Sequence, residues 1–542
     1  MPRDPQADRA ALEAIQGAVR AGDHARAAAL AQDALATGLE HPLVLNVAAL
    51  GLERQGSLAQ AEALLRRAVE IAPADIGARN AWGLCLLQLE RPREALGQFD
   101  ALIALRPELP FAHVSRGDAL RALGEATKAE ASYRQALTLD ERQALAWAGL
   151  ARIAAHRGSY PEARFRAQRA LAIVPDLSDA LMSLAAADLG ERKLADAEAR
   201  IRALLESGRL TPLQHAYANG QLGDLLDAAD RRSEAYAAYT ACNEALRALY
   251  ADRFADSGAL EYVRDLARYF ERARRELWTQ RARPDSSAPT GARHVFLLGF
   301  PRSGTTLLEM VLEGHPDVVS LEEKDSMIEG VREFMRDPHS LDRLASATPA
   351  TLEALRRAYW QRIADAGLDV SGKTFLDKYP LNTLKLPLIA RLFPDAWILL
   401  ACRDPRDVVL SCFRHRFQMS APIYELLSIE SAARYYDATM SLTIRLTSLL
   451  PLKVCLVRHE DVVTGFEREM KRICDFLSLT WHPGMGDFAL RTKERPVLTP
   501  STAQLVRGLN TEGIGHWRRY RPQLESVMTL LEPWVKRFYY DA

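Results

Sequence analysis

The first half of the sequence repeats with a period of 34 residues, and this period limits what it can fold into. Pro73, Pro107 and Pro175 lie in one register, separated by 34 residues or twice that number. Twelve positions before the register points stand alanines, at Ala61, Ala95, Ala129 and Ala163. Two helices approach closely only where side chains are small. The pattern therefore predicts a stack of helical hairpins.

Large side chains keep the same register as the alanines. Leu65, Phe99 and Tyr133 stand eight positions before their register points, and Gly83 and Gly117 stand 24 before. This pattern resembles the tetratricopeptide repeat, and we count about seven units within residues 1–250. The last unit, with Gly223, Ala235 and Tyr239, is displaced by four residues, which indicates a short insertion near residues 212–220. We expect an all-α superhelix over residues 1–250.

Composition excludes several classes of protein. The 542 residues include 70 Lys and Arg against 70 Asp and Glu, so no overall positive field favours nucleic acid. Six cysteines without C-x-x-C spacing argue against a disulfide framework or a zinc ribbon. The first residues have acidic side chains where an export signal would be apolar, and no apolar run is long enough to span a membrane. These features predict a cytoplasmic protein.

The composition changes after residue 250. A connecting segment at 251–292 contains a predicted helix, Leu260 to Gln280, and a polar linker. From residue 293 to 542, short apolar runs alternate with amphipathic helices, which predicts an α/β domain with a parallel sheet. The apolar runs are 294–300, 374–377, 396–404 and 453–461.

The first of these runs ends in a phosphate-binding pattern. Gly299 and Gly304 have the spacing of a P-loop between a strand and a helix, where backbone N–H groups can hold an anion. Thr305 replaces the lysine of nucleotide-hydrolysing P-loops, so Arg302 supplies the positive charge. We expect anion binding without ordinary Mg-dependent hydrolysis of a nucleotide. The alternative is a purely structural turn.

A second strand, turn and helix repeats this layout at 396–414. Arg403 stands at the predicted strand end and Ser411 about a turn into the helix, so both can reach one phosphate, with Arg406 nearby. The alternative is a helix with surface arginines. Two anion sites at one sheet edge suit a ligand with phosphates at both ends.

Together these segments point to a family. FPRSGTTLLE and LLACRDPRDVVLS resemble the 5′-phosphosulfate and 3′-phosphate loops of sulfotransferases that use 3′-phosphoadenosine 5′-phosphosulfate (PAPS). More narrowly, PRSGTTLLEMVLEGHPDVVSLEEK and DKYPLNTLK are similar to tyrosylprotein sulfotransferases. Joined to the repeats, the domain resembles bacterial tetratricopeptide–sulfotransferase fusions. The resemblance implies a P-loop-like sulfotransferase domain at 293–542.

The resemblance also assigns roles to residues. It implies Glu323 as general base, with Glu322 as the rival, and Lys378 as a contact of the transferring group. Three positions depart from the family pattern: Leu321, His459 and His516. No metal is implied. The implied donor-binding residues are Arg302, Ser303, Gly304, Thr305, Thr306, Arg403, Ser411, Ser501, Thr502 and Asn510.

The leading hypothesis is therefore transfer of a sulfuryl group to a hydroxyl acceptor, most simply a tyrosine of a protein or peptide held by the repeats. One alternative keeps the donor but takes a carbohydrate, lipid or small-molecule acceptor. Another is a non-catalytic scaffold that binds the nucleotide. The presence of Arg302, Glu323, Lys378, Arg403 and Ser411 together favours an enzyme.

Overall fold

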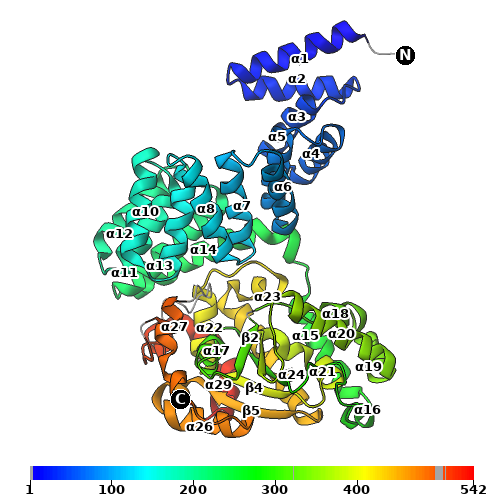
Figure 1. Ribbon diagram of the computed structural model, residues 1–542. Coiled ribbons are helices and arrows are strands. Elements are labelled where there is room, and N and C mark those ends of the chain that lie inside the picture. The colour runs from blue at the N-terminus through cyan, green and yellow to red at the C-terminus, as the bar shows by residue number, and fades with distance from the viewer. Residues whose placement is uncertain (1–3, 322, 495–504, 507, 542) are drawn as a thin grey trace. The chain divides into compact units, whose positions relative to one another are not determined.

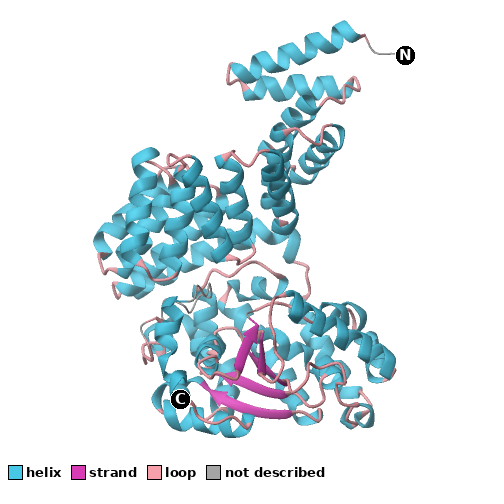
Figure 2. Cartoon of the chain, viewed as in Figure 1, coloured by secondary structure: helices cyan, strands magenta, loops and turns pink. Residues whose placement is uncertain are grey.

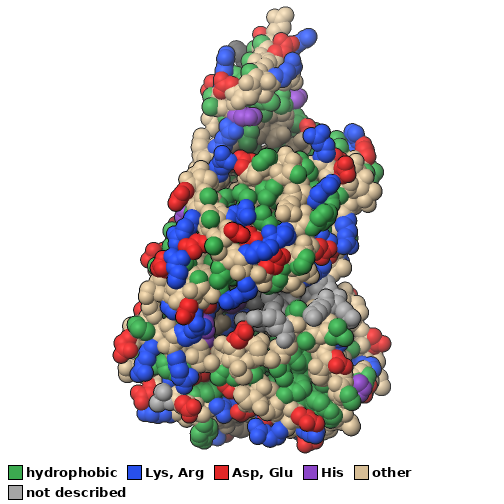
Figure 3. Space-filling view, turned by 90° about the vertical axis from the view of Figure 1, so that its left-hand side faces the viewer, with side chains coloured by type: hydrophobic (Ala, Val, Ile, Leu, Met, Phe, Trp, Pro, Cys, Tyr) green, Lys and Arg blue, Asp and Glu red, His purple; other side chains and the backbone are tan. Residues whose placement is uncertain are grey.

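The structure is a computed structural model that describes residues 4–321, 323–494, 505–506 and 508–541. The chain divides into two compact units, Met1–Glu191 and Arg192–Ala542. Within the described residues, no helix has the length and apolar character needed to cross a membrane. On the face shown in Figure 3, basic and acidic side chains are interspersed, in keeping with the net charge of zero.

The first unit consists of paired antiparallel helices (Figures 1 and 2). In chain order these are α1 (Pro5–Arg20), α2 (His24–Ala36), α3 (Pro42–Arg54), α4 (Leu58–Ile71), α5 (Ile76–Gln88), α6 (Pro92–Leu105), α7 (Pro110–Ala122), α8 (Ala126–Leu139), α9 (Ala144–His156), α10 (Tyr160–Ile173) and α11 (Ser178–Gly190). The predicted helical hairpins are confirmed.

The helix crossings explain the 34-residue period. Ala61, Ala95, Ala129 and Ala163 are completely buried. A Cβ atom added to Gly117 would lie 2.5 Å from the Tyr133 ring, so only glycine fits that crossing. Each hairpin also turns through a residue with positive φ. These residues follow the same period: Gly22, Gly56, Glu90, Gly124, Gly158 and Arg192.

The second unit begins with helices of the same repeat pattern. They are α12 (Leu194–Glu206), α13 (Pro212–Ala228) and α14 (Arg232–Phe254). The turn residue between α13 and α14 is Asp230, with φ 65°, four residues later than the period would place it. On α14, the Asn243 Nδ2 donates to the carbonyl of Phe413, 2.8 Å away, so the hairpin α13–α14 packs on the α/β part of the unit.

The connecting segment is also attached to the α/β part. Its helices are α15 (Ala259–Arg272) and α16 (Arg275–Thr279). The guanidinium of Arg356 donates to the carbonyls of Arg283 and Pro284, at 2.8 and 3.2 Å. The Trp360 indole donates to Asp285. The predicted linker is thus held along its length, and the limits 1–250, 251–292 and 293–542 stay predictions about independent folding.

A five-stranded parallel sheet forms the centre of the second unit (Figure 2). Its strands are β1 (Arg293–Gly299), β2 (Val318–Leu321), β3 (Thr374–Lys378), β4 (Trp397–Cys402) and β5 (Lys453–Arg458), in the order β2-β3-β1-β4-β5. Four of the strands confirm the predicted apolar runs, and β2 is an addition. The strand order reverses at β1, and parallel sheets bind ligands at the carboxyl ends of such strands.

Helices cover both faces of the sheet. Apolar side chains of β1, β4 and β5 pack against α17 and α26 on one face, while Phe296 packs on Phe393 on the other. The helices are α17 (Thr305–Leu312), α18 (Ile328–Phe334), α19 (Pro338–Ala345), α20 (Pro349–Asp365), α21 (Leu386–Leu392), α22 (Pro405–Arg414), α23 (Ala421–Tyr424), α24 (Ile429–Leu449), α25 (His459–Thr464), α26 (Phe466–Leu477), α27 (Phe488–Glu494) and α29 (Arg521–Arg537). Short 3-10 turns complete the unit: η1 (Pro380–Lys385), η2 (Glu425–Leu427), η3 (Pro483–Asp487) and η4 (His516–Tyr520).

Candidate active site

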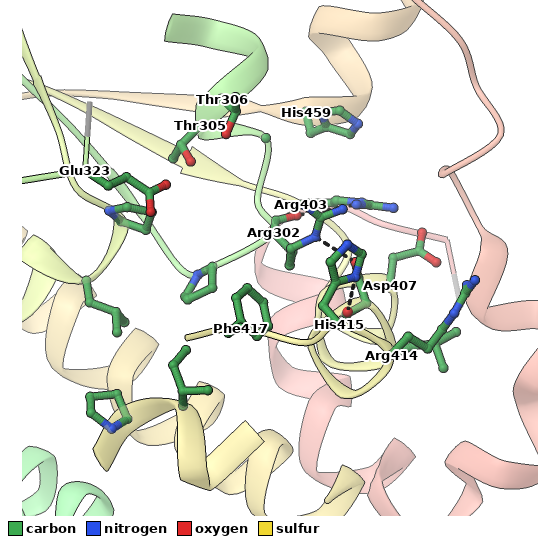
Figure 4. A pocket seen from close by; sticks show the side chains of 18 of the residues that line it. Arg302, Thr305, Thr306, Glu323, Arg403, Asp407, Arg414, His415, Phe417 and His459 are labelled. Carbon is green, nitrogen blue, oxygen red and sulfur yellow. Dashed lines mark hydrogen bonds between the residues drawn. The ribbon is translucent and has the colours of Figure 1, made fainter. Parts of the chain in front are cut away.

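A cavity of about 1410 Å³ opens at the carboxyl ends of β1 and β4. Figure 4 shows the side chains of its wall, with Glu323 at one side and Arg414 at the other. The sequence-predicted site residues in its lining are Arg302, Gly304, Thr305, Thr306, Glu323, Arg403, Ser411 and Asn510. Most of the predicted donor site therefore faces one space.

The turn between β1 and α17 supplies the first part of the wall. Arg302 and Gly304 both have positive φ, 70° and 96°, which reverses the chain before α17 begins at Thr305. A Cβ atom on Gly304 would lie 2.6 Å from Nδ1 of His459, so glycine is required at this position. The first N–H groups of α17 have no acceptor inside the helix, and a helix N-terminus of this kind favours an anion.

Arg302 links this turn to the second one. Its Nε donates to Ser411 Oγ at 3.0 Å, as the dashed line in Figure 4 shows. Burial, with help from the neighbouring Arg403, lowers the pKa of Arg302 to about 10. Two half-buried guanidinium groups in neighbouring turns repel each other, so a bound polyanion would stabilise both.

The turn between β4 and α22 supplies the second part. Arg403 donates to the carbonyl of Arg302 at 3.4 Å and to that of Gly513. Ser411, one turn from the end of α22, faces the cavity, and its carbonyl lies 3.0 Å from Nδ1 of His415. The two predicted anion-binding turns thus meet at the Arg302–Ser411 contact.

Arg406 does not take part in this wall, contrary to the expectation that it lies near the phosphate. Its guanidinium is 2.7 Å from Asp404 and lies over the Trp517 ring, 3.9 Å from the ring centre. Arg406 is 2% exposed. Its role is to hold the start of α22 against the C-terminal segment.

A buried ion-pair chain lies at the Glu323 end of the cavity. The Lys378 Nζ is 2.9 Å from Glu323 Oε1 and 3.0 Å from Glu309 Oε2. The side chains of Lys378 and Glu309 are completely buried, whereas that of Glu323 is 46% exposed. Lys378 therefore lies behind the cavity wall, and Glu323 stands between it and the open space.

The charges of Glu309, Lys378 and Glu323 depend on one another. Burial raises the pKa of Glu309 to about 7, although Lys378 opposes the rise. Burial alone would lower the pKa of Lys378, but Glu309 and Glu323 outweigh it and raise the pKa. Ser320 on β2 donates to Glu309 at 3.0 Å and to Glu313 at 2.6 Å. The lysine is thereby kept protonated and fixed in position.

The C-terminal segment closes the far side of the cavity. Asp407 on α22 accepts hydrogen bonds from the N–H groups of Gly515 and Trp517, at 2.7 and 2.8 Å. Asn510 lines the cavity, and its Nδ2 is 3.3 Å from the carbonyl of Gly508. The start of α22 and the C-terminal segment are thus joined by two hydrogen bonds.

Some predicted residues are placed elsewhere. Ser303 is 2% exposed and, like Lys378, is absent from the described lining of the cavity. Ser501, Thr502 and the rival base Glu322 lie outside the described residues. Sequence reasoning missed Glu309, although an acidic residue within the otherwise uncharged helical run TTLLEMVL was a signal that could have found it.

The comparisons with known proteins agree with this geometry. Residues 294–483 match the model of the sulfotransferase family, and residues 12–76, 80–144 and 114–178 match the tetratricopeptide repeat. The chain therefore carries tetratricopeptide repeats followed by a sulfotransferase domain.

The described part of the α/β unit contains no group of three His, Cys, Asp or Glu side chains placed to hold a metal ion.

The relatives resemble this chain only distantly and over less than half of its length. This chain is 26% identical to Protein-tyrosine sulfotransferase 1 of Danio rerio over 269 residues. The match covers 46% of this chain and 72% of that relative. The chain is also 26% identical to an uncharacterized protein of Aquifex aeolicus, but over 45% of this chain and only 33% of that protein.

Among solved structures, the Sulfotransferase Domain from the Synechococcus PCC 7002 Olefin Synthase is 19% identical, with a TM-score of 0.30, covering 48% of this chain and all of that domain.

Proposed function

We propose that this chain transfers a sulfuryl group from PAPS to a hydroxyl acceptor, most simply a tyrosine side chain of a protein or peptide. The observation that carries the proposal is the convergence of two anion-binding turns and an acidic residue on one cavity. A donor with a phosphosulfate at one end and a phosphate at the other matches two separate cationic turns.

The residues present fit such a donor. Arg302 and the N–H groups at the start of α17 would hold the 5′-phosphosulfate, and Arg403 with Ser411 would hold the 3′-phosphate. A Cβ atom at Gly304 would collide with His459, so glycine allows this turn to approach the His459 ring closely. Charge-assisted hydrogen bonds to phosphate oxygens are about twice as strong as neutral ones, so these contacts favour the dianionic 3′-phosphate.

Glu323 and Lys378 would act at the reacting end. The acceptor oxygen forms a bond to sulfur while its proton passes to the Glu323 carboxylate, and the bond from sulfur to the 5′-phosphate oxygen breaks. The electron pair of that bond leaves with adenosine 3′,5′-bisphosphate. Lys378, paired with Glu323 from behind the cavity wall, would act through that carboxylate by holding it in position for the proton transfer.

Glu309, the completely buried partner of Lys378, supports the Lys378–Glu323 pair. Without its carboxylate the Lys378 ammonium would have one acidic neighbour in place of two, and burial would favour the neutral amine. We infer that Glu309 keeps Lys378 charged and pointing toward Glu323. A neutral residue at 309 should therefore reduce turnover more than donor affinity.

The tyrosine acceptor rests on the distant relatives whose names include protein-tyrosine sulfotransferase. Repeat superhelices present long surfaces that suit extended peptides, so the repeats would recruit the protein that carries the acceptor. A carbohydrate, lipid or small hydroxyl acceptor would use the same donor chemistry.

The test has two stages. First, calorimetry should show that the full chain binds adenosine 3′,5′-bisphosphate much more tightly than ATP; equal affinities would contradict the donor assignment. Second, PAPS with labelled sulfate is incubated with a proteome lysate and the labelled group is identified, with Glu323→Gln as the control. Label on tyrosine supports the acceptor, whereas labelled glycan with unlabelled protein would overturn it.

A further inference from the structure

Three carboxylates at the C-terminal end of α13 face basic residues from the α/β part of the same unit. Asp224 pairs with Arg416, Asp227 with Arg414, and Asp230 with Arg519. Asp224 and Asp227 are three residues apart on α13, so they lie along one face of the helix end, and Asp230 follows in the turn after the helix. The hairpin α13–α14 therefore meets the α/β part through charge as well as through packing.

Asp227 has the most partners of the three. Its carboxylate accepts a 2.6 Å hydrogen bond from the Tyr520 hydroxyl, pairs with Arg232 and Arg414, and lies 3.6 Å from Nε2 of His516. The side chain is only 12% exposed. Burial would raise the pKa of Asp227, but His516, Arg414 and Tyr520 outweigh it and hold the pKa well below its usual range.

These partners belong to two walls of the donor cavity. Arg414 ends α22, the helix that carries Ser411, and it lines the cavity together with His516 and Asp227 itself. The Arg414 guanidinium also contacts the His516 ring. Asp227 thus ties the α22 wall to η4, the turn that begins after Gly515 and contains Trp517, both of which donate to Asp407.

In the repeat register, an aspartate stands at this position only in the last hairpin, and one earlier hairpin has a glutamate there. The equivalent positions of the earlier hairpins hold Val19, Glu53, Leu87, Arg121, Ala155 and Leu189. In α7–α8 that residue is a cation, Arg121, which lies 3.7 Å from Asp118 of its own helix. A repeat helix therefore needs no aspartate here for its own fold.

We propose that Asp227 is a positioning residue of the donor site, which rests on the proposed function above. By holding Arg414 and the His516–Tyr520 turn, it fixes the two walls between which the 3′-phosphate half of the donor would bind. Asp227 acts through these partners and need not touch the donor.

The test compares two aspartates of the same helix end. The dissociation constant for adenosine 3′,5′-bisphosphate is measured by calorimetry for the full chain, for Asp227→Asn and for Asp230→Asn, whose side chain is 73% exposed. Because a charge-assisted contact is replaced, Asp227→Asn should weaken binding about tenfold or more, and Asp230→Asn less than about twofold. Equal losses in both variants, or no loss in Asp227→Asn, would overturn the proposal.

A second readout separates positioning from general stability. In the full chain, bound bisphosphate should slow amide hydrogen exchange in residues 220–230 as well as in α17. In Asp227→Asn, protection should persist in α17 and disappear from 220–230. Unchanged protection of 220–230 in the variant would also overturn the proposal.

If Asp227→Asn fails to fold, Tyr520→Phe replaces it. That variant removes one hydroxyl and leaves the ion pairs intact, so the melting temperature should change little while bisphosphate binding weakens about threefold. Unaltered affinity in Tyr520→Phe would count against the proposal. Failure of the unmodified chain to bind bisphosphate would instead contradict the proposed function itself.

Discussion

The helical hairpins α7–α8 and α13–α14 share one internal design. In both, a glycine lies against a tyrosine ring: a Cβ atom on Gly117 would be 2.5 Å from Tyr133, and one on Gly223 would be 2.5 Å from Tyr239. In both, the tyrosine hydroxyl donates to an aspartate fifteen residues earlier, at 2.7 and 3.0 Å. The core of the repeat is therefore unchanged in the last hairpin.

The two hairpins differ where the first helix ends. Arg121 and Gly124 in α7–α8 correspond to Asp227 and Asp230 in α13–α14, and both turn residues have positive φ. A basic and a neutral residue at the end of α7 are thus replaced by two aspartates at the end of α13, and these aspartates pair with arginines of the α/β part. A repeat can thus be adapted to a catalytic domain by changing its end and keeping its core.

The largest effect should come from removing the last hairpin. Deleting residues 1–191 keeps α13–α14, and binding of adenosine 3′,5′-bisphosphate should be nearly normal. Deleting residues 1–250 leaves Arg414 and Arg416 without their carboxylates, so binding should fall by at least about 100-fold or the protein should not fold. Calorimetry and thermal melting of the two truncated chains decide between these outcomes.

Equal bisphosphate affinities in the two truncated chains would contradict the inference that the last hairpin supports the donor site. The sequence alone places every donor motif within residues 293–542, which would make the shorter chain sufficient. The ion pairs of Asp224 and Asp227 are the reason to expect otherwise.

Glu323→Gln should lower turnover and leave bisphosphate affinity unchanged, whereas a change in the hairpin should lower the affinity. The amide keeps the shape of the side chain and loses its basicity, so turnover should fall by about 10² to 10⁴ while the bisphosphate affinity stays nearly constant. Initial rates with labelled PAPS and calorimetry on the same preparation measure the two effects. Normal turnover would show that Glu323 is not the base and would direct attention to Glu322.

Arg403→Ala should lower donor affinity without disturbing the hairpin. Loss of a charge-assisted contact to phosphate costs about 1.5–3 kcal/mol, or about 10- to 150-fold in the dissociation constant. Amide exchange of residues 220–230 in the unliganded protein should match that of the unmodified chain. Faster exchange there would mean that Arg403 also supports the hairpin.

The smallest effects come from a matched pair of glycine variants. Gly117→Ala and Gly223→Ala each place a methyl group against a buried tyrosine, and each should destabilise its own unit by about 1–3 kcal/mol. Only Gly223→Ala should also weaken bisphosphate binding, because only α13 holds Asp227. Denaturant unfolding and calorimetry measure the two quantities, and equal binding losses would refute the distinction.

The sequence predicts features that depend on neighbours along the chain. The 34-residue period predicts the hairpins because each crossing joins adjacent helices, and four apolar runs predict four strands. The strand β2, Val318–Leu321, is missed because its short apolar run is interrupted by Ser320. The meeting of Arg302 with Ser411 follows from general rules for parallel sheets, which bring strand ends to one edge.

Other features depend on contacts that no local pattern contains. The Lys378 ammonium lies between Glu309 and Glu323, and although Glu309 stands out in its apolar helical run, its pairing with Lys378 is seen only once β3 lies beside α17. Asp227 resembles an ordinary surface acid of a helix until Arg414, 187 residues later, is placed against it. Arg406 is misjudged for the same reason, since its position is set by Trp517.

The contact between Asp227 and Tyr520 joins residues 293 positions apart. During synthesis, each hairpin of the first unit finds its partners within about one period, and such local contacts form fast. The carboxylate of Asp227 gains this partner only after Tyr520 has been made. We therefore expect a nascent chain whose repeats are folded long before its donor site exists, so that the repeats can meet a protein partner on the ribosome before any chemistry is possible.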